Sequence, residues 1–467
     1  MNSLQVAIYD ALPIAVQNVL CTLDGYRRSR YRFTAHFEAQ LASWERTVGD
    51  PIEQQHARQW TALKQLLERA RTQTRYYRFL PGIEENDSCD PTTALERTLK
   101  QIPILEKTVY RARTKDFLAA DMSASEYVER STSGTTGTAL RVFDSHERFA
   151  ENYAAVWRQR RSFGITRDDP FLSFTGQITT PLIQKSAPYW RTDNYSGRVL
   201  FSIYHMSPDN LTSYIDPIHD FPARYVEGYP SALHIVSRAM IDENRCLPPG
   251  KLKAIFTSSE SLLPHQRTAI ETAFAAPVRD HYAATEHLVS MAACEEHMLH
   301  VDMEFGIVEV EVQEENDDWV RGPLIVTGLG RPAAPMIRYR IGDIGTRSKK
   351  PCPCGRPGDV FLDIDGRIED YIVTPDGRLV GRMDHVFKGR YDIAEAQIIQ
   401  DDFTELRVLV VPSNEWNDGD SRNRLRRELE GRIGSEMNIQ IEITDQIARE
   451  PNGKLRAVKS SIHGARA

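Results

Sequence analysis

A loop rich in small hydroxyl side chains is the first stretch of this sequence that could bind a charged ligand. Residues 131–140 read STSGTTGTAL, so two glycines stand among serines and threonines. Glycines let backbone N–H groups curl around phosphate oxygens, and the hydroxyls add donors without adding bulk. The stretch lacks the GK[ST] ending of a Walker P-loop. By itself it could equally be an ordinary surface loop, because such clusters are common between periodic segments.

Four further stretches supply side chains for nucleotide chemistry, although each alone also has an ordinary structural explanation. HYAATEH places Thr285 next to Glu286, which could be a solvated helix start. RYRIGDIG supplies Asp343, which could be a turn aspartate. Two later stretches, GRIEDYI and EPNGKLRAV, supply three more charged side chains: Arg367, Glu369 and Lys454. The order of the stretches is therefore more informative than any one of them.

A second group of residues has the types and spacing of a metal site. Cys294 and His300 lie in CEEHMLH, and Cys352 and Cys354 lie in CPCG. Four such ligands in two clusters suit a closed, tetrahedral zinc site with a structural role. The C-x-C spacing is tighter than the usual C-x2-C, and His297 competes with His300. Buried free cysteines with surface histidines are the alternative, but the gathering of three of the six cysteines favours zinc.

The hydrophobic pattern predicts the elements that must position these residues. Residues 1 to about 120 are predicted to be helical from the spacing in FEAQLASWERTV and QQHARQWTALKQLLERA. Between about 140 and 330, short apolar runs alternate with helical stretches, which is typical of an α/β fold. Beyond a boundary near residue 366, TELRVLVVP, SRNRLRRELEGRIG and NIQIEITDQI predict strand, helix and strand. We therefore expect a large domain over 1–366 and a small α+β domain over 367–467.

Length and charge exclude several classes of protein. A chain of 467 residues is too long for one ordinary core. Its net charge of −7 argues against nucleic acid as the main partner. It has no run of 18 apolar residues, and its first residues do not have the pattern of a signal peptide. Six cysteines do not make a disulfide framework, so we expect a cytoplasmic protein. We also expect a monomer or homodimer with no membrane partner.

Taken in order, the motifs resemble those of the adenylate-forming enzyme superfamily of acyl-CoA and aryl-CoA ligases, luciferases and peptide-synthetase adenylation domains. LPIAVQNVL, VEGYPSAL, PMIRYRIGD and CPCGR resemble its phenylacetate–CoA ligase-like branch, which includes capsular-polysaccharide and deazaflavin-adenylating relatives. The resemblance covers nearly the whole chain. It implies a large α/β N-terminal domain and a small, mobile C-terminal domain, with ATP between them and Glu369 at the hinge. Some relatives with a similar Cys/His pattern carry zinc there.

The resemblance implies a place for each part of ATP. The β- and γ-phosphates would be held by the hydroxyl-rich loop: Thr132, Ser133, Gly134, Thr135, Thr136 and Gly137. The adenine would lie against Tyr282, with Ser259 and Glu260 where relatives have a glycine-rich turn. Ala283 would also line the ATP site, although relatives usually have glycine there. The backbone at that point therefore approaches the ligand differently.

The resemblance also implies the groups that would carry the reaction. Thr285 would contact the α-phosphate, and Glu286 would bind Mg²⁺. Asp343 would accept hydrogen bonds from the ribose hydroxyls, and Arg367 would contact ribose and phosphate. Lys454 would reach the attacking oxyanion and the α-phosphate from the small domain. Adenylation turns a carboxylate into a mixed anhydride, and it needs such cations to offset the repulsion between anions.

The function implied is ATP- and Mg²⁺-dependent, AMP-forming activation of a carboxylic acid, expected to be aromatic. The acyl group would then pass to CoA, an amine or a carrier protein. The alternatives are nitrite activation, amide formation, AMP transfer to a cofactor hydroxyl, or a non-catalytic nucleotide-binding module. Four residues are candidates for the acid pocket, although a core role suits each of them at least as well: Phe174, His205, Tyr229 and Pro230.

Overall fold

The computed structural model describes residues 3–80, 90–131, 140–365, 372–380, 383–387, 390, 392–413, 415–448 and 456–462. The helices, including two short 3-10 helices (η), are α1 (Ser3–Ala11), α2 (Ile14–Arg32), α3 (Ala35–Thr47), α4 (Ile52–Gln73), α5 (Pro91–Gln101), α6 (Lys107–Ala112), η1 (Thr114–Phe117), α7 (His146–Ser162), α8 (Pro208–Asp220), α9 (Pro230–Asp242), α10 (Pro264–Phe274), η2 (Met383–Phe387) and α11 (Asp418–Ile433). In this part of the chain, every helix is too short or too polar to span a bilayer.

The strands form one large sheet, one smaller sheet and two hairpins, which confirms the predicted α/β class. The strands are β1 (Tyr127–Ser131), β2 (Arg141–Ser145), β3 (Phe171–Phe174), β4 (Trp190–Asp193), β5 (Arg198–Phe201), β6 (Tyr225–Gly228), β7 (Ala254–Ser258), β8 (Val278–Ala283), β9 (Ser290–Ala293), β10 (Leu299–Val301), β11 (Gly306–Val310), β12 (Glu314–Glu315), β13 (Trp319–Gly328), β14 (Tyr339–Ser348), β15 (Val360–Asp365), β16 (Ile372–Val373), β17 (Leu379–Val380), β18 (Ile393–Gln400), β19 (Glu405–Pro412), β20 (Asn438–Ile443) and β21 (Val458–Ser460).

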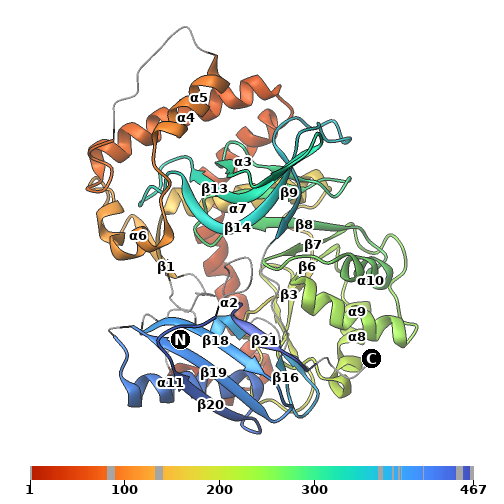
Figure 1. Cartoon of the computed structure of the whole chain (residues 1–467). Helices are drawn as coiled ribbons and strands as arrows, with labels where there is room; N and C mark the ends of the chain where they lie inside the picture. The colour runs from red at the N-terminus through yellow and green to blue at the C-terminus, as the bar shows by residue number, and fades with distance from the viewer. Residues whose placement is uncertain are drawn as a thin grey trace.

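The large sheet has the order β11-β13-β14-β15-β10-β9-β8-β7-β6-β3-β5-β4, with β12 beside β13. Strands β8, β7, β6, β3 and β5 run parallel to one another, and the other neighbours are antiparallel. Helices α8, α9 and α10 cover one flank of the parallel strands (Figure 1). Ligands bind at the carboxyl ends of such strands, so this edge is where the predicted site should lie.

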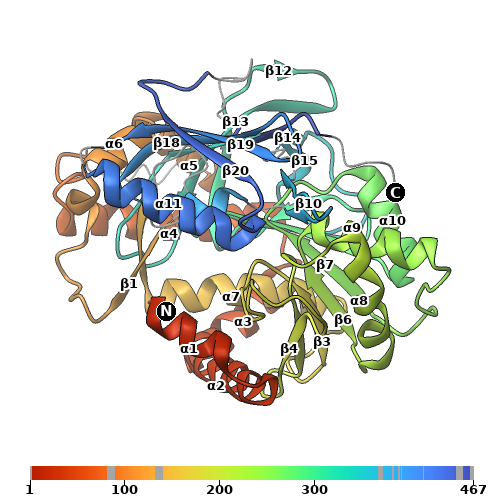
Figure 2. The same ribbon diagram turned by 90° about the horizontal axis from the view of Figure 1, so that it is seen from below.

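The N-terminal helices pack against this sheet through small or apolar faces. Phe37, Leu41 and Trp44 lie on one face of α3 and are buried. Helix α2 comes very close to β4 at Gly25. A Cβ at this position would lie 2.2 Å from Asp193 Oδ2, so only glycine fits there. Figure 2 shows α1 and α2 beside α7 at the edge of the molecule. The helices therefore form a wall next to the parallel strands.

The C-terminal part is a four-stranded sheet of order β20-β19-β18-β21, with α11 against it. Leu425, Leu429 and Ile433 recur every four residues along α11, and all three are buried. Arg378 Nη1 donates to the backbone carbonyl oxygen of Tyr204 at 2.9 Å, which joins this part to the large sheet. The proposed boundary at residue 366 lies outside the described residues, and the domain division stays a prediction.

Candidate active site and metal cluster

The hydroxyl-rich loop connects the two strands of a hairpin. Strands β1 and β2 pair antiparallel, with Ser131 opposite Arg141. The loop residues and three further predicted site residues lie outside the described part of the chain: Thr132, Ser133, Gly134, Thr135, Thr136, Gly137, Arg367, Glu369 and Lys454. The structure therefore fixes the base of the loop, and the roles of these nine residues stay predictions.

The turn after β8 holds the two residues predicted to meet the α-phosphate and Mg²⁺. Glu286 is buried, and its Oε1 accepts a hydrogen bond of 3.3 Å from the hydroxyl of Tyr339. Lys107 Nζ lies 4.0 Å from the same oxygen. Thr285 is exposed, and its carbonyl oxygen accepts a 2.7 Å hydrogen bond from Arg130 Nη2 on β1. The base of the hydroxyl-rich loop is thus bonded directly to the turn that carries Glu286.

Two of the predicted nucleotide contacts are bonded to each other. The hydroxyl of Tyr282, on β8, donates to Asp343 Oδ2, on β14, at 2.7 Å. These strands are not neighbours in the sheet order, so the contact crosses the face of the sheet. A phenol that donates to a carboxylate fixes the carboxylate's orientation and leaves its other oxygen for a ligand. Ala283 ends β8 and is exposed beside this pair.

The residues at the end of β7 lie where relatives have a glycine-rich turn. Ser259 has φ +71°, a left-handed conformation that favours glycine. Glu260 Oε2 accepts a 3.0 Å hydrogen bond from the backbone N–H of Ser231, in the first turn of α9. The carboxylate therefore satisfies one of the free N–H groups at this helix start and lies in its positive field. Sequence reasoning missed this contact, because residues 231 and 260 are far apart in the chain.

A buried charge cluster beneath the hairpin was also missed. Asp144, on β2, lies 2.9 Å from His287 Nδ1 and forms an ion pair with Arg130. Burial opposes the charge of Asp144, but His287 and Arg130 together hold its pKa below the usual value. Burial lowers the pKa of His287 despite the nearby carboxylate. Arg148 donates to the carbonyl oxygen of His287 from Nε and Nη2, at 3.0 and 2.7 Å. The cluster ties the hairpin to the Glu286 turn.

The four candidates for the acid pocket occupy different surroundings. Phe174 is buried and stacks on Phe201, with ring centroids 4.5 Å apart. His205 is buried, and burial together with nearby Arg378 lowers its pKa to about 4. Pro230 is the first residue of α9. Among the four, Tyr229 lines a cavity of about 920 Å³ that runs along β3 and β6. The roles of all four residues stay predictions.

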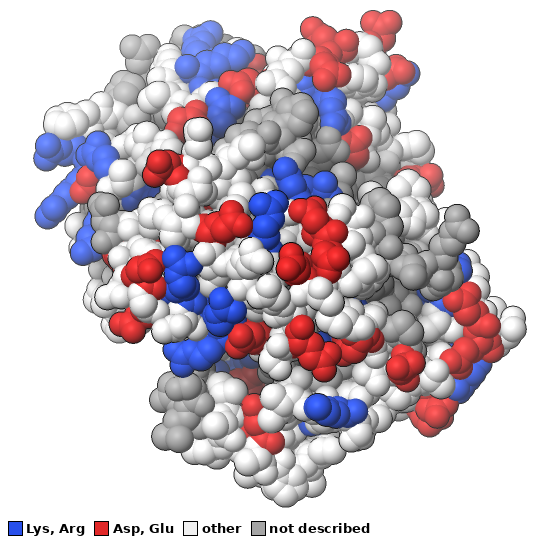
Figure 3. Space-filling view, turned by 60° about the horizontal axis from the view of Figure 1, so that its bottom comes forward, with Lys and Arg blue, Asp and Glu red and all other residues white. Residues whose placement is uncertain are grey.

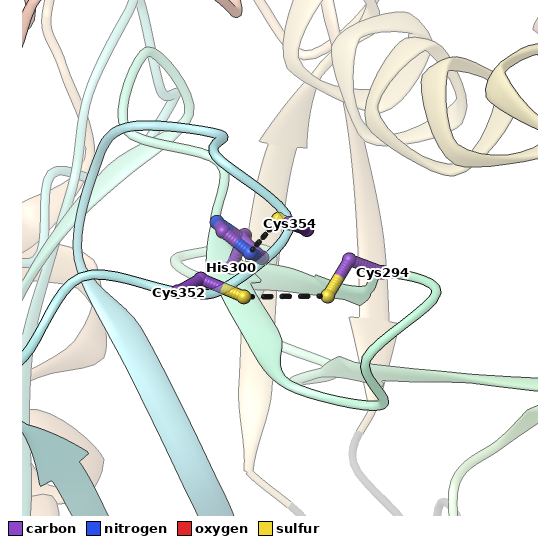
Figure 4. A group of neighbouring side chains, drawn as sticks. All are labelled: Cys294, His300, Cys352 and Cys354. Atoms are coloured by element: carbon purple, nitrogen blue, oxygen red, sulfur yellow. Dashed lines mark hydrogen bonds between the residues drawn. The ribbon is translucent and has the colours of Figure 1, made fainter.

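The predicted metal ligands, in contrast, converge at one point (Figure 4). The ligand atoms of Cys294, His300, Cys352 and Cys354 all lie within 4.8 Å of one another. Cys294 follows β9 and His300 lies in β10, while the two other cysteines lie between β14 and β15. Strands β9 and β15 both pair with β10 and so bring the segments together.

The spacing within this cluster fits a zinc ion. Cys294 Sγ lies 3.6 Å from Cys352 Sγ, and Cys354 Sγ lies 3.3 Å from His300 Nε2. The edges of a tetrahedron with zinc–sulfur and zinc–nitrogen bonds of about 2.3 and 2.0 Å are roughly 3.5–3.8 Å. His297 does not belong to the group, because its Nδ1 lies 2.9 Å from Arg267 Nη1. The geometry therefore groups His300 with the three cysteines, and its role as a zinc ligand stays a prediction.

Comparisons with known proteins bear on the fold and the family resemblance. Residues 372–461 match the family described as CapK C-terminal domain. Protein CapK of Staphylococcus aureus is 24% identical over 459 residues, which cover 97% of this chain and 99% of that protein. A 2-hydroxyisobutyryl-CoA ligase with 2-HIB-AMP and CoA, in the thioesterification state, is 19% identical with a TM-score of 0.56, covering 89% of this chain and 92% of that one.

The same ligase in the postadenylation state with R3-HIB-AMP has a TM-score of 0.52 at 19% identity, covering 88% of this chain and 91% of that one. At this identity the likeness shows the fold, which agrees with the fold that the sequence motifs implied. The resemblance inferred from the sequence is confirmed: the chain has the fold of an adenylate-forming CoA ligase, with a C-terminal segment similar to that of CapK.

Proposed function

We propose that this protein is an AMP-forming enzyme that activates a carboxylic acid as its acyl-adenylate. The observation that supports this best is the hydrogen bond from Arg130 to the carbonyl oxygen of Thr285. It joins the base of a phosphate-type loop to the turn that carries Glu286, the predicted Mg²⁺ ligand. Tyr282 and Asp343 lie along the same edge of the sheet, already bonded to each other. The side chains proposed for the metal and the ribose are thus each held by a neighbouring hydroxyl, which supports the proposal.

In the first step, a carboxylate oxygen attacks the α-phosphorus of ATP, and pyrophosphate leaves. Asp343, oriented by Tyr282, accepts hydrogen bonds from the ribose hydroxyls. Glu286 would hold Mg²⁺, which would supply positive charge at the phosphates. Lys454 stabilises the developing charge at the α-phosphate. In the second step, a nucleophile attacks the acyl carbon and AMP leaves, with the thiol of CoA as the proposed nucleophile.

Two other outcomes start from the same residues. The acceptor could be an amine, nitrite or a cofactor hydroxyl in place of CoA, or the protein could bind nucleotide without catalysis. The presence of Glu286, Asp343, Arg367 and Lys454 together favours catalysis over binding alone, because binding by itself needs no lysine for the developing charge. AMP formation measured with and without CoA separates the possible acceptors.

A pyrophosphate-exchange screen tests the proposal. Aryl acids, fatty acids, amino acids and nitrite are each incubated with the protein, ATP, Mg²⁺ and labelled pyrophosphate. We expect at least one acid to give labelled ATP, and a Glu286→Gln variant to lose the exchange. An acid that is turned over with release of ADP and phosphate would overturn the proposal.

We further propose that the Cys294–His300–Cys352–Cys354 cluster holds one zinc ion in a structural role. Burial raises the pKa of the Cys294 and Cys352 thiols, so a divalent cation is needed to keep them ionised. The backbone N–H of Arg356 donates to Cys354 Sγ at 3.4 Å, and such a donor stabilises a thiolate that binds a metal. Four protein ligands leave no open position for water. Elemental analysis of protein purified without chelator should find about one zinc per chain, and protein without zinc would refute the assignment.

A further inference from the structure

A cavity beside the proposed nucleotide site has no role in the chemistry described so far. It measures about 920 Å³ and runs along β3 and β6, from Phe171 and Tyr225 at their first residues to Thr175 and Tyr229 just past their last. Its other walls come from α2, α7 and α11. Tyr229 lies two residues before Ser231, whose N–H donates to Glu260, next to the proposed adenine position. We call this space the arginine chamber.

The lining of the arginine chamber is strongly basic. Three carboxylates face it, those of Asp168, Glu227 and Glu428. Six arginines also line it: Arg28, Arg32, Arg160, Arg167, Arg198 and Arg432. On the face of the molecule shown in Figure 3, by comparison, basic and acidic side chains are mixed. A concave wall with an excess of one charge concentrates ligands of the opposite charge.

Most of these arginines form ion pairs with nearby carboxylates. The pairs are Arg28 with Asp24, Arg160 with Glu227, Arg167 with Glu38, Arg198 with Asp193, and Arg432 with Glu428. Arg32 is different, since no carboxylate of the described residues lies within ion-pair distance of it. Its guanidinium lies 4.5 Å from the centre of the Tyr153 ring. Arg32 is therefore the cation of the chamber that is left for a ligand.

The charge of Arg32 has no carboxylate partner among the described residues. Burial lowers the pKa of Arg32, so this charge carries an energetic cost in the free protein. A ligand anion would relieve that cost and accept hydrogen bonds from the Arg32 guanidinium.

The walls between the arginines are aromatic. Tyr153 and Trp157 come from α7, and Tyr225 and Tyr229 come from β6 and the residue after it. Aromatic walls favour a flat apolar body, because ring faces and edges pack well against planar groups. The chamber thus combines planar walls with one free guanidinium, and its volume lies within the range of small-molecule sites.

We infer that the arginine chamber binds the body of the acid substrate, and that this acid is aromatic and carries a second anionic group that pairs with Arg32. The activated carboxylate would lie near Tyr229, and the second group, a carboxylate, sulfonate or phosphate, would lie toward Arg32. This inference rests on the proposed function, which it makes more specific by naming a substrate class. The phosphates of CoA have the same chemistry and are the other possible source of an anion at Arg32.

Binding and exchange with matched acids test the inference. Phenylacetate and 3-phenylpropanoate are compared with their ring-carboxylated and ring-sulfonated counterparts, by calorimetry with and without ATP and by pyrophosphate exchange. We expect the dianionic members, which carry the second anionic group on the ring, to bind about tenfold or more tightly than the parent monoanions. Arg32→Ala should weaken binding of the dianionic members about tenfold to a hundredfold, the scale for a hydrogen bond to a charged group. It should leave binding of the monoanionic members and the KM for ATP unchanged.

Two further variants control the result. Arg32→Lys keeps the charge and should restore part of the affinity. Arg27→Ala removes a neighbouring arginine of α2 that is outside the chamber and 80% exposed, and it should change nothing. A preference for the monoanionic acids, or equal weakening of both kinds by Arg32→Ala, would overturn the inference. So would an Arg32→Ala effect confined to the KM for CoA. Tight, Arg32-dependent binding of an anionic acid without pyrophosphate exchange would leave the inference standing and refute the proposed function instead.

Discussion

The Cys/His cluster and the proposed nucleotide edge are built in opposite ways. In the cluster, strand pairing brings four ligand atoms together, and they face one another. Along the nucleotide edge, each acidic group is held by a different protein group: Glu286 by Tyr339, Asp343 by Tyr282, and Glu260 by the N–H of Ser231. A closed ligand set suits a permanent ion that braces the fold. Carboxylates that are each held by one protein group, and that lie along an edge of the sheet, suit a ligand that binds and dissociates in each reaction cycle.

The largest expected effect concerns the first chemical step. Lys454→Ala should slow adenylation by about 10²–10³-fold, the scale for removing one preorganised transition-state donor. Transfer from chemically supplied acyl-adenylate should be far less affected, because the lysine serves only the first step. The two rates are measured separately, by pyrophosphate exchange and by acyl transfer. Equal loss in both assays would contradict this division of labour.

The next effect concerns the charge cluster that joins the hairpin to the Glu286 turn. Asp144→Asn removes the only carboxylate recorded in contact with both His287 and Arg130 among the described residues. Asp144 is buried, so the substitution breaks its ion pair with Arg130 and its contact with His287, which should lower the free energy of unfolding by about 3 kcal/mol. It should also raise the KM for ATP, since Arg130 positions Thr285. Denaturant unfolding and ATP kinetics measure the two effects.

A matched control lies on the partner strand. Glu129→Gln changes a half-exposed carboxylate whose contact is Arg141 at 3.6 Å, and it should cost less than about 0.5 kcal/mol. If Asp144→Asn destabilises the protein no more than this control, the cluster does not have the proposed role.

The metal cluster should give a smaller effect and leave catalysis alone. Cys352→Ser should abolish zinc binding and lower the free energy of unfolding by roughly 2 kcal/mol. Adenylation by the folded protein should stay close to normal, because the cluster is a brace and not part of the reaction. Cys246→Ser, at an exposed cysteine, is the control. If Cys352→Ser keeps the stability of the unaltered protein, or folds normally but is inactive, the proposed contrast between a structural metal cluster and a catalytic nucleotide edge is wrong.

The smallest effect tests how firmly the nucleotide edge is fixed. Tyr282→Phe removes the hydroxyl that donates to Asp343 at 2.7 Å. Losing one hydrogen bond to a charged group costs about 1.5 kcal/mol, so we expect the KM for ATP to rise about tenfold with little change in stability. An unchanged KM would mean that Asp343 needs no orientation by Tyr282.

The two regions also differ in how far the sequence could predict them. The metal cluster was predictable because its ligand types are rare and lie in two short clusters, although only strand pairing decided between His297 and His300. Glu286 and Asp343 were found through the order of the motifs. The α/β class followed from the alternation of strand and helix patterns.

What the sequence could not predict depends on contacts between distant segments. Asp144 sits in RVFDS, a short stretch in which nothing signals a buried contact with residue 287. Arg32 belongs to a run of arginines on α2, and nothing in that run signals that it lines a cavity with Tyr153 of α7. Phe174 was a pocket candidate and lies buried on Phe201. In each case tertiary packing, not local pattern, decides what the side chain does.

The fate of one oxygen atom tests the central claim most directly. An acid substrate labelled with oxygen-18 in its carboxylate is turned over with ATP, Mg²⁺ and an acceptor, and the products are analysed by mass spectrometry. If the carboxylate attacks the α-phosphorus, one labelled oxygen must leave with the phosphate of AMP, and pyrophosphate must be unlabelled. Label in inorganic phosphate, with ADP as the other product, would mean attack at the γ-phosphorus and would contradict the account.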